Sequence, residues 1–104
     1  MKKEMYRTWL AEKMKPASIS DRLSRCACVE KALGVDLDIE YKKDKGNRIL
    51  QLLHYSINDM RTGKKLPKGF HFKEGADVNR RMTDLRSAVG RYFDFCSSMS
   101  EDKA

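Results

Sequence analysis

The stretch from residue 79 to residue 96 carries the pattern that most constrains the fold. Its apolar side chains recur at steps of three and four residues, which places them on one side of an α-helix. They are Met82, Leu85, Val89, Tyr92 and Cys96. Asp77 is a plausible N-cap, and we expect the helix to run from there to about residue 98. Such a helix must pack its apolar side against other elements.

The opposite side of this predicted helix is polar and rich in arginine. Arg81 and Arg86 flank the apolar stripe, and five further side chains point away from it. These five are Arg80, Asp84, Ser87, Arg91 and Asp94. Guanidinium groups suit phosphate oxygens and the edge of guanine. This side of the helix is therefore a candidate nucleic-acid interface.

The same periodicity predicts three further helices upstream, over residues 3–14, 19–33 and 47–61. The chain is thus predicted to be an all-α bundle of four helices, with a long basic loop before the last one. We expect a single domain over residues 1–98 and a polar tail over residues 99–104.

The boundaries of the second helix follow from turn and cap residues. Pro16 ends smooth continuation from the first helix, Ser18 is the expected N-cap, and Gly34 is the expected stop. Residues 35–43 alternate apolar and polar side chains. We interpret them as an extended connector packed on the bundle, with a short hairpin to the later loop as the alternative.

The charge balance favours an anionic partner. Lysine and arginine number 22 against 15 acidic residues in 104, a formal charge of +7. Residues 61–73 hold five bases and no acid, and we expect Lys64, Lys65 and Lys68 to contact a nucleic-acid backbone. The alternative is a solvated loop whose lysines only keep the protein in solution.

Phe70 and Phe72 lie among these lysines and have two possible roles. They could close the open end of the bundle as an apolar lid. Alternatively, they could stack on unpaired bases or insert into a duplex step.

Membrane insertion and a disulfide framework are not expected. No apolar segment approaches the length of about 20 residues that crosses a bilayer, and acidic and basic residues interrupt any signal-like start. Three cysteines, an odd number, fit a reducing compartment, so we expect a cytoplasmic protein. Cys26 and Cys96 fall on apolar stripes and are expected in the core.

The sequence offers little catalytic chemistry. His54 and His71 are its two histidines, and neither belongs to a zinc-ligand pattern. The glycines form no phosphate-binding loop. We therefore expect no enzymatic activity, no metal and no cofactor. Glu30 is the misfit within an apolar stripe; it is expected at the edge of the stripe, in contact with solvent or an arginine, with a functional buried carboxylate as the alternative.

Three segments resemble parts of the N-terminal core-binding domain of phage-type tyrosine recombinases (integrases). The chain has an aromatic-x-x-Trp-Leu pattern at residues 6–10 and a serine-led helix start at residues 18–23. Residues 85–95, Leu-Arg-Ser-Ala-Val-Gly-Arg-Tyr-Phe-Asp-Phe, resemble the last helix of that domain. The basic loop and the alternating segment are longer than the usual connections of the family.

This resemblance implies a SAM-like orthogonal helical bundle that clamps duplex DNA during recombination and integration by a phage or mobile element. The residues that would contact DNA are Ser20, Arg22 and Arg25 in the second helix and Arg80, Arg86 and Arg91 in the last. The catalytic domain of a recombinase would have to follow, so the chain is expected to be an excised or stand-alone relative.

Together these observations predict a non-catalytic module that binds nucleic acid, with double-stranded DNA as the expected partner. The alternative is a small helical adaptor or inhibitor that binds an acidic protein through its basic side.

Overall fold

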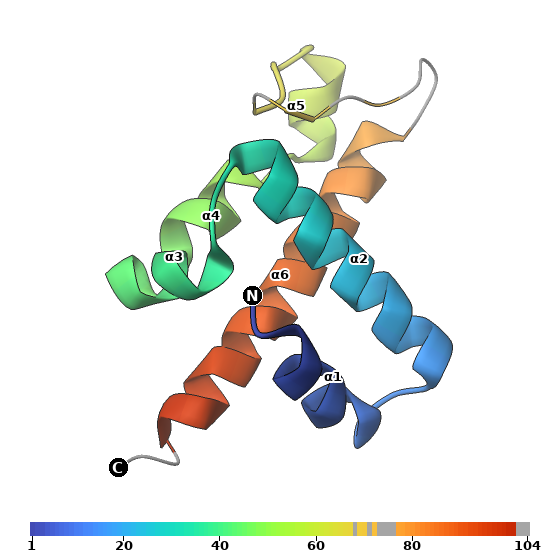
Figure 1. Ribbon diagram of the computed structural model, residues 1–104. Helices are drawn as coiled ribbons and strands as arrows, with labels where there is room; N and C mark the ends of the chain where they lie inside the picture. Colours follow the sequence, from blue (N-terminus) through green and yellow to red (C-terminus); the bar gives the residue numbers. More distant parts are fainter. Residues whose placement is uncertain (68, 71, 73–76, 102–104) are drawn as a thin grey trace.

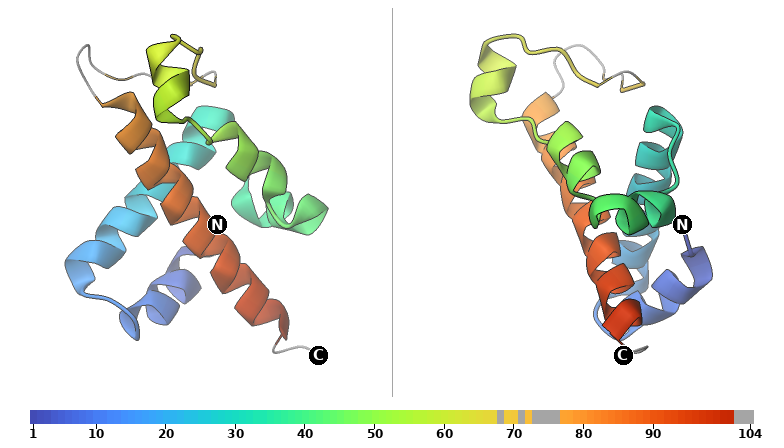
Figure 2. Two further views of the ribbon diagram at one scale, coloured as in Figure 1. Left: turned by 180° about the vertical axis from the view of Figure 1, so that it is seen from behind. Right: turned by 90° about the vertical axis from the view of Figure 1, so that its left-hand side faces the viewer.

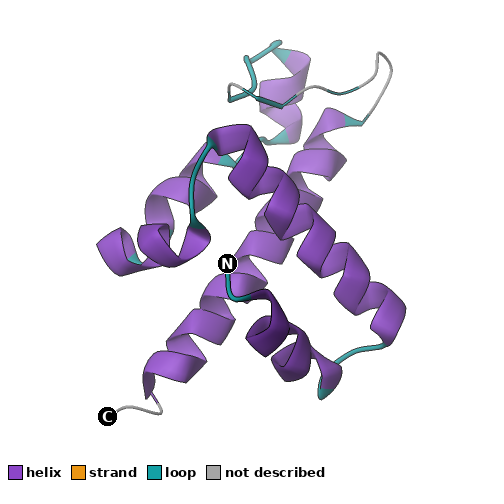
Figure 3. Ribbon diagram, in the orientation of Figure 1, coloured by secondary structure: helices purple, strands orange, loops and turns teal. Residues whose placement is uncertain are grey.

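The computed structural model describes residues 1–67, 69, 70, 72 and 77–101, without the side chains of residues 100 and 101. These residues form helices and connecting loops, with no strand among them, which confirms the predicted all-α class (Figure 3). The described part contains six helices, not the four predicted. They are α1 (Lys3–Ala11), α2 (Pro16–Leu33), α3 (Leu37–Asp44), α4 (Asn47–Leu52), α5 (Ile57–Arg61) and α6 (Val78–Glu101). Nothing in the structure identifies their arrangement as SAM-like.

Helices α1 and α2 are joined across Pro16. The first helix ends at Ala11, earlier than predicted. Pro16 occupies the first turn of α2, where its missing N–H costs nothing, and Lys15 before it is extended. The predicted start at Ile19 with Ser18 as N-cap was therefore wrong. The predicted end was right, because Gly34 terminates α2 with a left-handed φ of 65°.

Helix α3 replaces the extended connector predicted for residues 35–43. Asp36 caps this helix by accepting a hydrogen bond from the Asp38 backbone N–H at 2.8 Å. Glu30 Oε2 accepts the Leu37 N–H at 3.0 Å. Leu37 is fully buried, whereas Ile39 is 52% exposed. The alternating pattern therefore does not mark two sides of a strand.

The predicted helix over residues 47–61 is two helices, α4 and α5, with Tyr55 buried between them. Ser56 and Asp59 form a capping box that starts α5 afresh. The Asp59 N–H donates to Ser56 Oγ at 3.0 Å, and the Ser56 N–H donates to Asp59 Oδ2 at 3.0 Å. This capping box interrupts residues 47–61, whose apolar spacing predicts one continuous helix.

Helix α6 follows its predicted pattern most closely. Asp77 Oδ1 accepts the Arg80 N–H at 3.1 Å, as expected of an N-cap. Four of the five predicted stripe residues are buried, and Cys96 is half-buried. The helix continues to Glu101 rather than stopping at residue 98, so residues 99–101 belong to it and not to a tail.

The remaining helices pack around α6, which spans the molecule from end to end (Figure 1). Helix α2 crosses it closely, and the Cys26 thiol at the crossing donates to the Ala88 carbonyl at 3.4 Å. The largest fully buried side chains are Tyr6, Tyr92, Phe95, Leu10, Leu37, Ile49, Leu53, Met82, Val29, Val89 and Cys26. Phe70 is buried and Phe72 packs against the core, as the apolar-lid interpretation predicts.

One side of α6 is left uncovered. Figure 2 shows this face, with α5 projecting beyond the start of α6 on the same side. Among the described helices none is long and apolar enough to span a membrane.

Candidate nucleic-acid interface

The uncovered side of α6 carries the polar residues predicted from sequence. Arg80, Ser87, Arg91 and Asp94 are exposed, and Asp84 is half-exposed. The stripe Met82–Cys96 holds the other side of the helix in the core. This division fixes the direction of the arginines, because rotating α6 would expose apolar surface.

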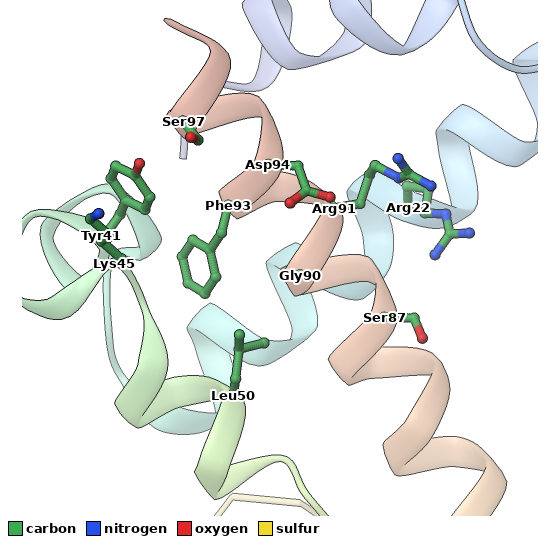
Figure 4. Close-up of a pocket in the computed structure, with 10 residues that line it drawn as sticks. All are labelled: Arg22, Tyr41, Lys45, Leu50, Ser87, Gly90, Arg91, Phe93, Asp94 and Ser97. Carbon is green, nitrogen blue, oxygen red and sulfur yellow. The ribbon is translucent and has the colours of Figure 1, made fainter. Parts of the chain in front are cut away.

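Arg91 meets an arginine from another helix. It lines a shallow surface hollow of about 600 Å³ together with Arg22 of α2. Figure 4 shows their guanidinium groups side by side at one edge of α6. The hollow extends across Gly90, where the missing side chain keeps the surface low, to Tyr41 and Lys45 beyond α6.

A second hollow brings another pair of arginines together. Arg25 of α2 and Arg81 of α6 line a space of about 230 Å³. A neighbouring hollow of about 360 Å³ is lined by Arg80 and Arg81 together with two acids, Asp77 and Asp84. Arginines of α2 and α6 therefore converge at two places along one face, which we call the α2/α6 face. Its hollows are lined by Arg22, Arg25, Arg80, Arg81 and Arg91 together with Asp77, Asp84 and Asp94, and the predicted Arg86, exposed on α6, lines none of the three.

None of these six arginines belongs to an ion pair within the described residues. The ion pairs there involve the Met1 ammonium, Lys43, Arg48 and Lys64. Guanidinium groups without an ion-pair partner on an accessible face are available to an external anion. The three interspersed carboxylates, Asp77, Asp84 and Asp94, lower the positive potential locally without neutralising the face.

Arg86 has a partial structural role. Its Nε donates to the Leu50 carbonyl at 3.0 Å, which ties α6 to the end of α4. The residue is otherwise exposed. The Nε–H of Arg86 is thus already used, which leaves the other N–H groups of its guanidinium for an external anion.

Lys64, Lys65 and Ser20 line none of these three hollows. Lys64 Nζ is 3.6 Å from Asp59 Oδ2, so its charge is partly compensated, and Lys65 is exposed. Both follow α5 in the chain. Lys68 lies outside the described residues. Ser20 is exposed on α2 but lines none of the three hollows.

Sequence reasoning missed Lys45 and Tyr41 as residues beside the candidate interface. Lys45 follows α3 in a left-handed conformation with φ of 61°. Tyr41 stacks on Phe93, with ring centroids 6.0 Å apart. An α-helical reading of residues 37–44 would have been needed to place either of them. The acids Asp36 and Asp38 followed by Lys42 and Lys43 were the available signal for that helix.

Glu30 lies at the edge of its stripe, with its side chain 21% exposed. Its partner is not an arginine. The Met1 ammonium donates to Glu30 Oε2 at 3.2 Å and lies 3.4 Å from Asp36 Oδ1. Burial alone would lower the pKa of this ammonium, but the hydrogen bond to Glu30 and the nearby acids raise it. The carboxylate thus serves an ion-pair cluster and the start of α3.

The thiols of Cys26, which is buried, and Cys96, which is half-buried, are poorly suited to nucleophilic chemistry. Burial, aided by the Glu30 charge, raises the pKa of Cys26 to about 12. Burial and the Asp38 charge raise the pKa of Cys96 to about 11. Within the described ranges no three histidine, cysteine or acidic side chains group as metal ligands. His54 is exposed, and His71 falls outside those ranges.

Comparison with known proteins gives no relative from which a function could be transferred: no family model, curated protein or solved structure matches this chain.

Proposed function

We propose that this protein is a non-catalytic nucleic-acid-binding module that binds double-stranded DNA through the α2/α6 face. The observation that carries the proposal is the convergence of Arg22 with Arg91 and of Arg25 with Arg81 from two crossing helices. Each arginine lacks an ion-pair partner among the described residues. Guanidinium forks bind phosphate oxygens in bidentate geometry.

The shape of the face supports a duplex rather than a single small anion. From Arg80 to Arg91, α6 rises about 16 Å at 1.5 Å per residue. That length matches several phosphates along a duplex strand, since phosphates repeat at about 3.4 Å of axial rise. The resemblance to the recombinase core-binding domain, in which the second and last helices lie near DNA, supports the same pair of helices and a role in recombination or integration.

The central experiment is an electrophoretic mobility series with a mixed-sequence duplex at increasing salt. The variant Arg80→Glu/Arg91→Glu is compared with the control Lys3→Glu/Lys31→Glu, which changes exposed cations on α1 and on the C-terminal turn of α2. Both double variants lower the formal charge by four units. Net charge alone therefore cannot explain a difference between them.

We expect the first variant to lose most of its duplex affinity and the control to bind like the wild type. Wild-type affinity should fall linearly on a log–log plot against salt, with a slope of about −0.9 per neutralised phosphate. Equal binding by both variants, or duplex binding that is independent of salt, would refute the proposal. If the wild-type protein still binds polyglutamate at salt concentrations that abolish duplex binding, an acidic protein partner is favoured instead.

A further inference from the structure

Helix α5 exposes apolar side chains that the fold does not use. Five large hydrophobic residues are exposed in the described part of the chain, and three of them fall within residues 52–60. They are Leu52, Ile57 and Met60. Ile57 and Met60 are three residues apart on α5, so they share one side of that helix. No residue of α5 is buried.

Polar contacts, rather than a core, fix α5 in position. The Ser56–Asp59 capping box sets its start, and the Thr62 hydroxyl donates to the Asp59 carbonyl at 3.2 Å. The Tyr55 hydroxyl donates to the Lys64 carbonyl at 2.7 Å. The Asn79 amide then donates to the Tyr55 carbonyl at 2.7 Å, which connects this segment to α6. These hydrogen bonds hold α5 in place while its apolar side faces solvent.

The charges around this apolar side select its partner. Arg61, Lys64 and Lys65 follow Met60 within five residues and are exposed, and the nearby acid Asp59 is already engaged by Ser56 and Lys64. A second copy of the chain would bring these cations against their own equivalents, which is unfavourable. A polyanion with an apolar interior fits both the charge and the exposed side chains.

The position of α5 connects it to the proposed interface. It projects beyond the start of α6 on the side left uncovered by the other helices (Figure 2). Arg80 and Arg81 lie in the first turn of α6, directly after Asn79. A duplex lying along the α2/α6 face would therefore reach α5 at one end of the contact.

We propose that α5 is an apolar wedge: Ile57 and Met60 enter a base step of the duplex from the minor groove and bend it. Isoleucine and methionine are among the side chains that unstack base steps in this way, and the resulting kinks are about 20–90°. Arg61 and Lys65 contact the flanking phosphates. This inference rests on the proposed duplex binding and adds to it a deformation of the DNA.

The test measures the bend directly. A duplex of about 30 base pairs with a central TA step, chosen because such steps kink easily, carries a donor and an acceptor dye at its two ends. We expect wild-type protein to shorten the end-to-end distance measured by energy transfer. Ile57→Ala/Met60→Ala should lose at least half of that change while keeping the same salt slope, because it removes no cation.

The matched control is Met5→Ala/Ile39→Ala, which removes the same side chains from exposed positions on α1 and α3. Ile39 and Ile57 are 52% and 53% exposed, and Met5 is 47% exposed against 37% for Met60, so the control removes at least as much exposed apolar surface. The control should bend the duplex as the wild type does. Met60→Gln, which keeps the helix propensity and length of the side chain, provides a second variant should the alanine pair fail to fold.

Three results would overturn the wedge. The first is equal bending by wild type and the Ile57/Met60 variant, and the second is wild-type binding without any bend. The third is a wild-type dimer in sedimentation equilibrium that the variant does not form, which would make this surface a self-association site. By contrast, failure of the proposed duplex binding is seen as the absence of salt-dependent binding by the wild type.

Discussion

Arg22 of α2 and Arg91 of α6 lie side by side at the edge of one surface hollow, although they are far apart in the sequence (Figure 4). Two positively charged guanidinium groups are therefore held close together. Neither of them forms an ion pair with an acidic residue of the described structure. The close packing of α2 on α6 imposes this arrangement. The resulting repulsion favours binding of an anion between them.

Replacing either arginine separates the functional role from a structural one. We expect Arg22→Ala and Arg91→Ala each to change the free energy of unfolding by less than about 0.5 kcal/mol, since neither makes an ion pair in the described structure. Each should weaken duplex binding for all sequences alike and lower the salt slope by about one. Chemical denaturation and a salt series of binding isotherms check the two expectations. A large loss of stability with unchanged binding would contradict them.

The long helix was predictable because its pattern repeats over many turns. Five apolar positions from Met82 to Cys96 allow one helical phase and no strand reading. The side that faces outward followed from the same phase. What periodicity could not supply was the partner helix, and hence the pairing of Arg22 with Arg91.

The short helices show the limit of that reasoning. Helix α3 has eight residues, too few turns for periodicity to outweigh an alternating pattern, and it is fixed by the side chains of Asp36 and Glu30. The apolar residues keep their helical spacing across the break between α4 and α5, so this spacing alone does not reveal the break. The Ser56–Asp59 spacing was its readable signal, because a capping box starts a new helix.

Two glycines with left-handed backbones give a matched test of packing. Gly34 has φ of 65° and open space where a Cβ would lie, whereas at Gly46, with φ of 80°, a Cβ would overlap the Phe93 ring. We expect Gly34→Ala to cost about 1–2 kcal/mol of unfolding free energy, from the backbone alone. Gly46→Ala should cost about 1–3 kcal/mol more, because the buried Phe93 ring must move. Equal midpoints in urea for the two variants would exclude the ring clash as a cause.

Ionisation of Glu40 should make the free energy of unfolding depend on pH in the acidic range. Its side chain is buried and accepts two hydrogen bonds from Arg48, at 2.8 and 3.2 Å. The hydrogen bond from Arg48 lowers the pKa of this carboxyl below 4.5, despite the opposing effect of burial. A carboxyl whose pKa is lower in the folded state stabilises fully above its unfolded pKa. That stabilisation is lost as the pH falls through the folded value.

We therefore expect Glu40→Gln to be less stable than wild type by about 1–3 kcal/mol at pH 7. The gap should narrow as the pH falls below 4.5, the ordinary value for this carboxyl. Urea denaturation of both proteins between neutral and acidic pH measures it. A gap that stays constant with pH would show that the Arg48 contact does not depend on ionisation.

Two buried tyrosines differ in whether their hydroxyl groups form hydrogen bonds. The Tyr92 hydroxyl accepts a hydrogen bond from the Lys2 N–H at 2.8 Å and donates one to Asp38. Burial raises the pKa of Tyr92, and the hydrogen bond to Asp38 raises it further. The Tyr6 hydroxyl is buried with no hydrogen-bond partner in the described structure, and burial raises its pKa as well. The rings meet edge to face, with centroids 4.9 Å apart.

Removing each hydroxyl should therefore have different effects on the free energy of unfolding. Tyr92→Phe leaves the Lys2 N–H and the Asp38 carboxylate without this partner, and we expect a loss of about 1–3 kcal/mol. Tyr6→Phe removes an unpaired buried oxygen and keeps the ring, so we expect no loss and up to about 1 kcal/mol of gain. Both values follow from thermal and urea denaturation at neutral pH, where neither hydroxyl ionises. A comparable loss for Tyr6→Phe would mean that its hydroxyl has a partner, such as a buried water, and would place a polar contact inside the aromatic cluster.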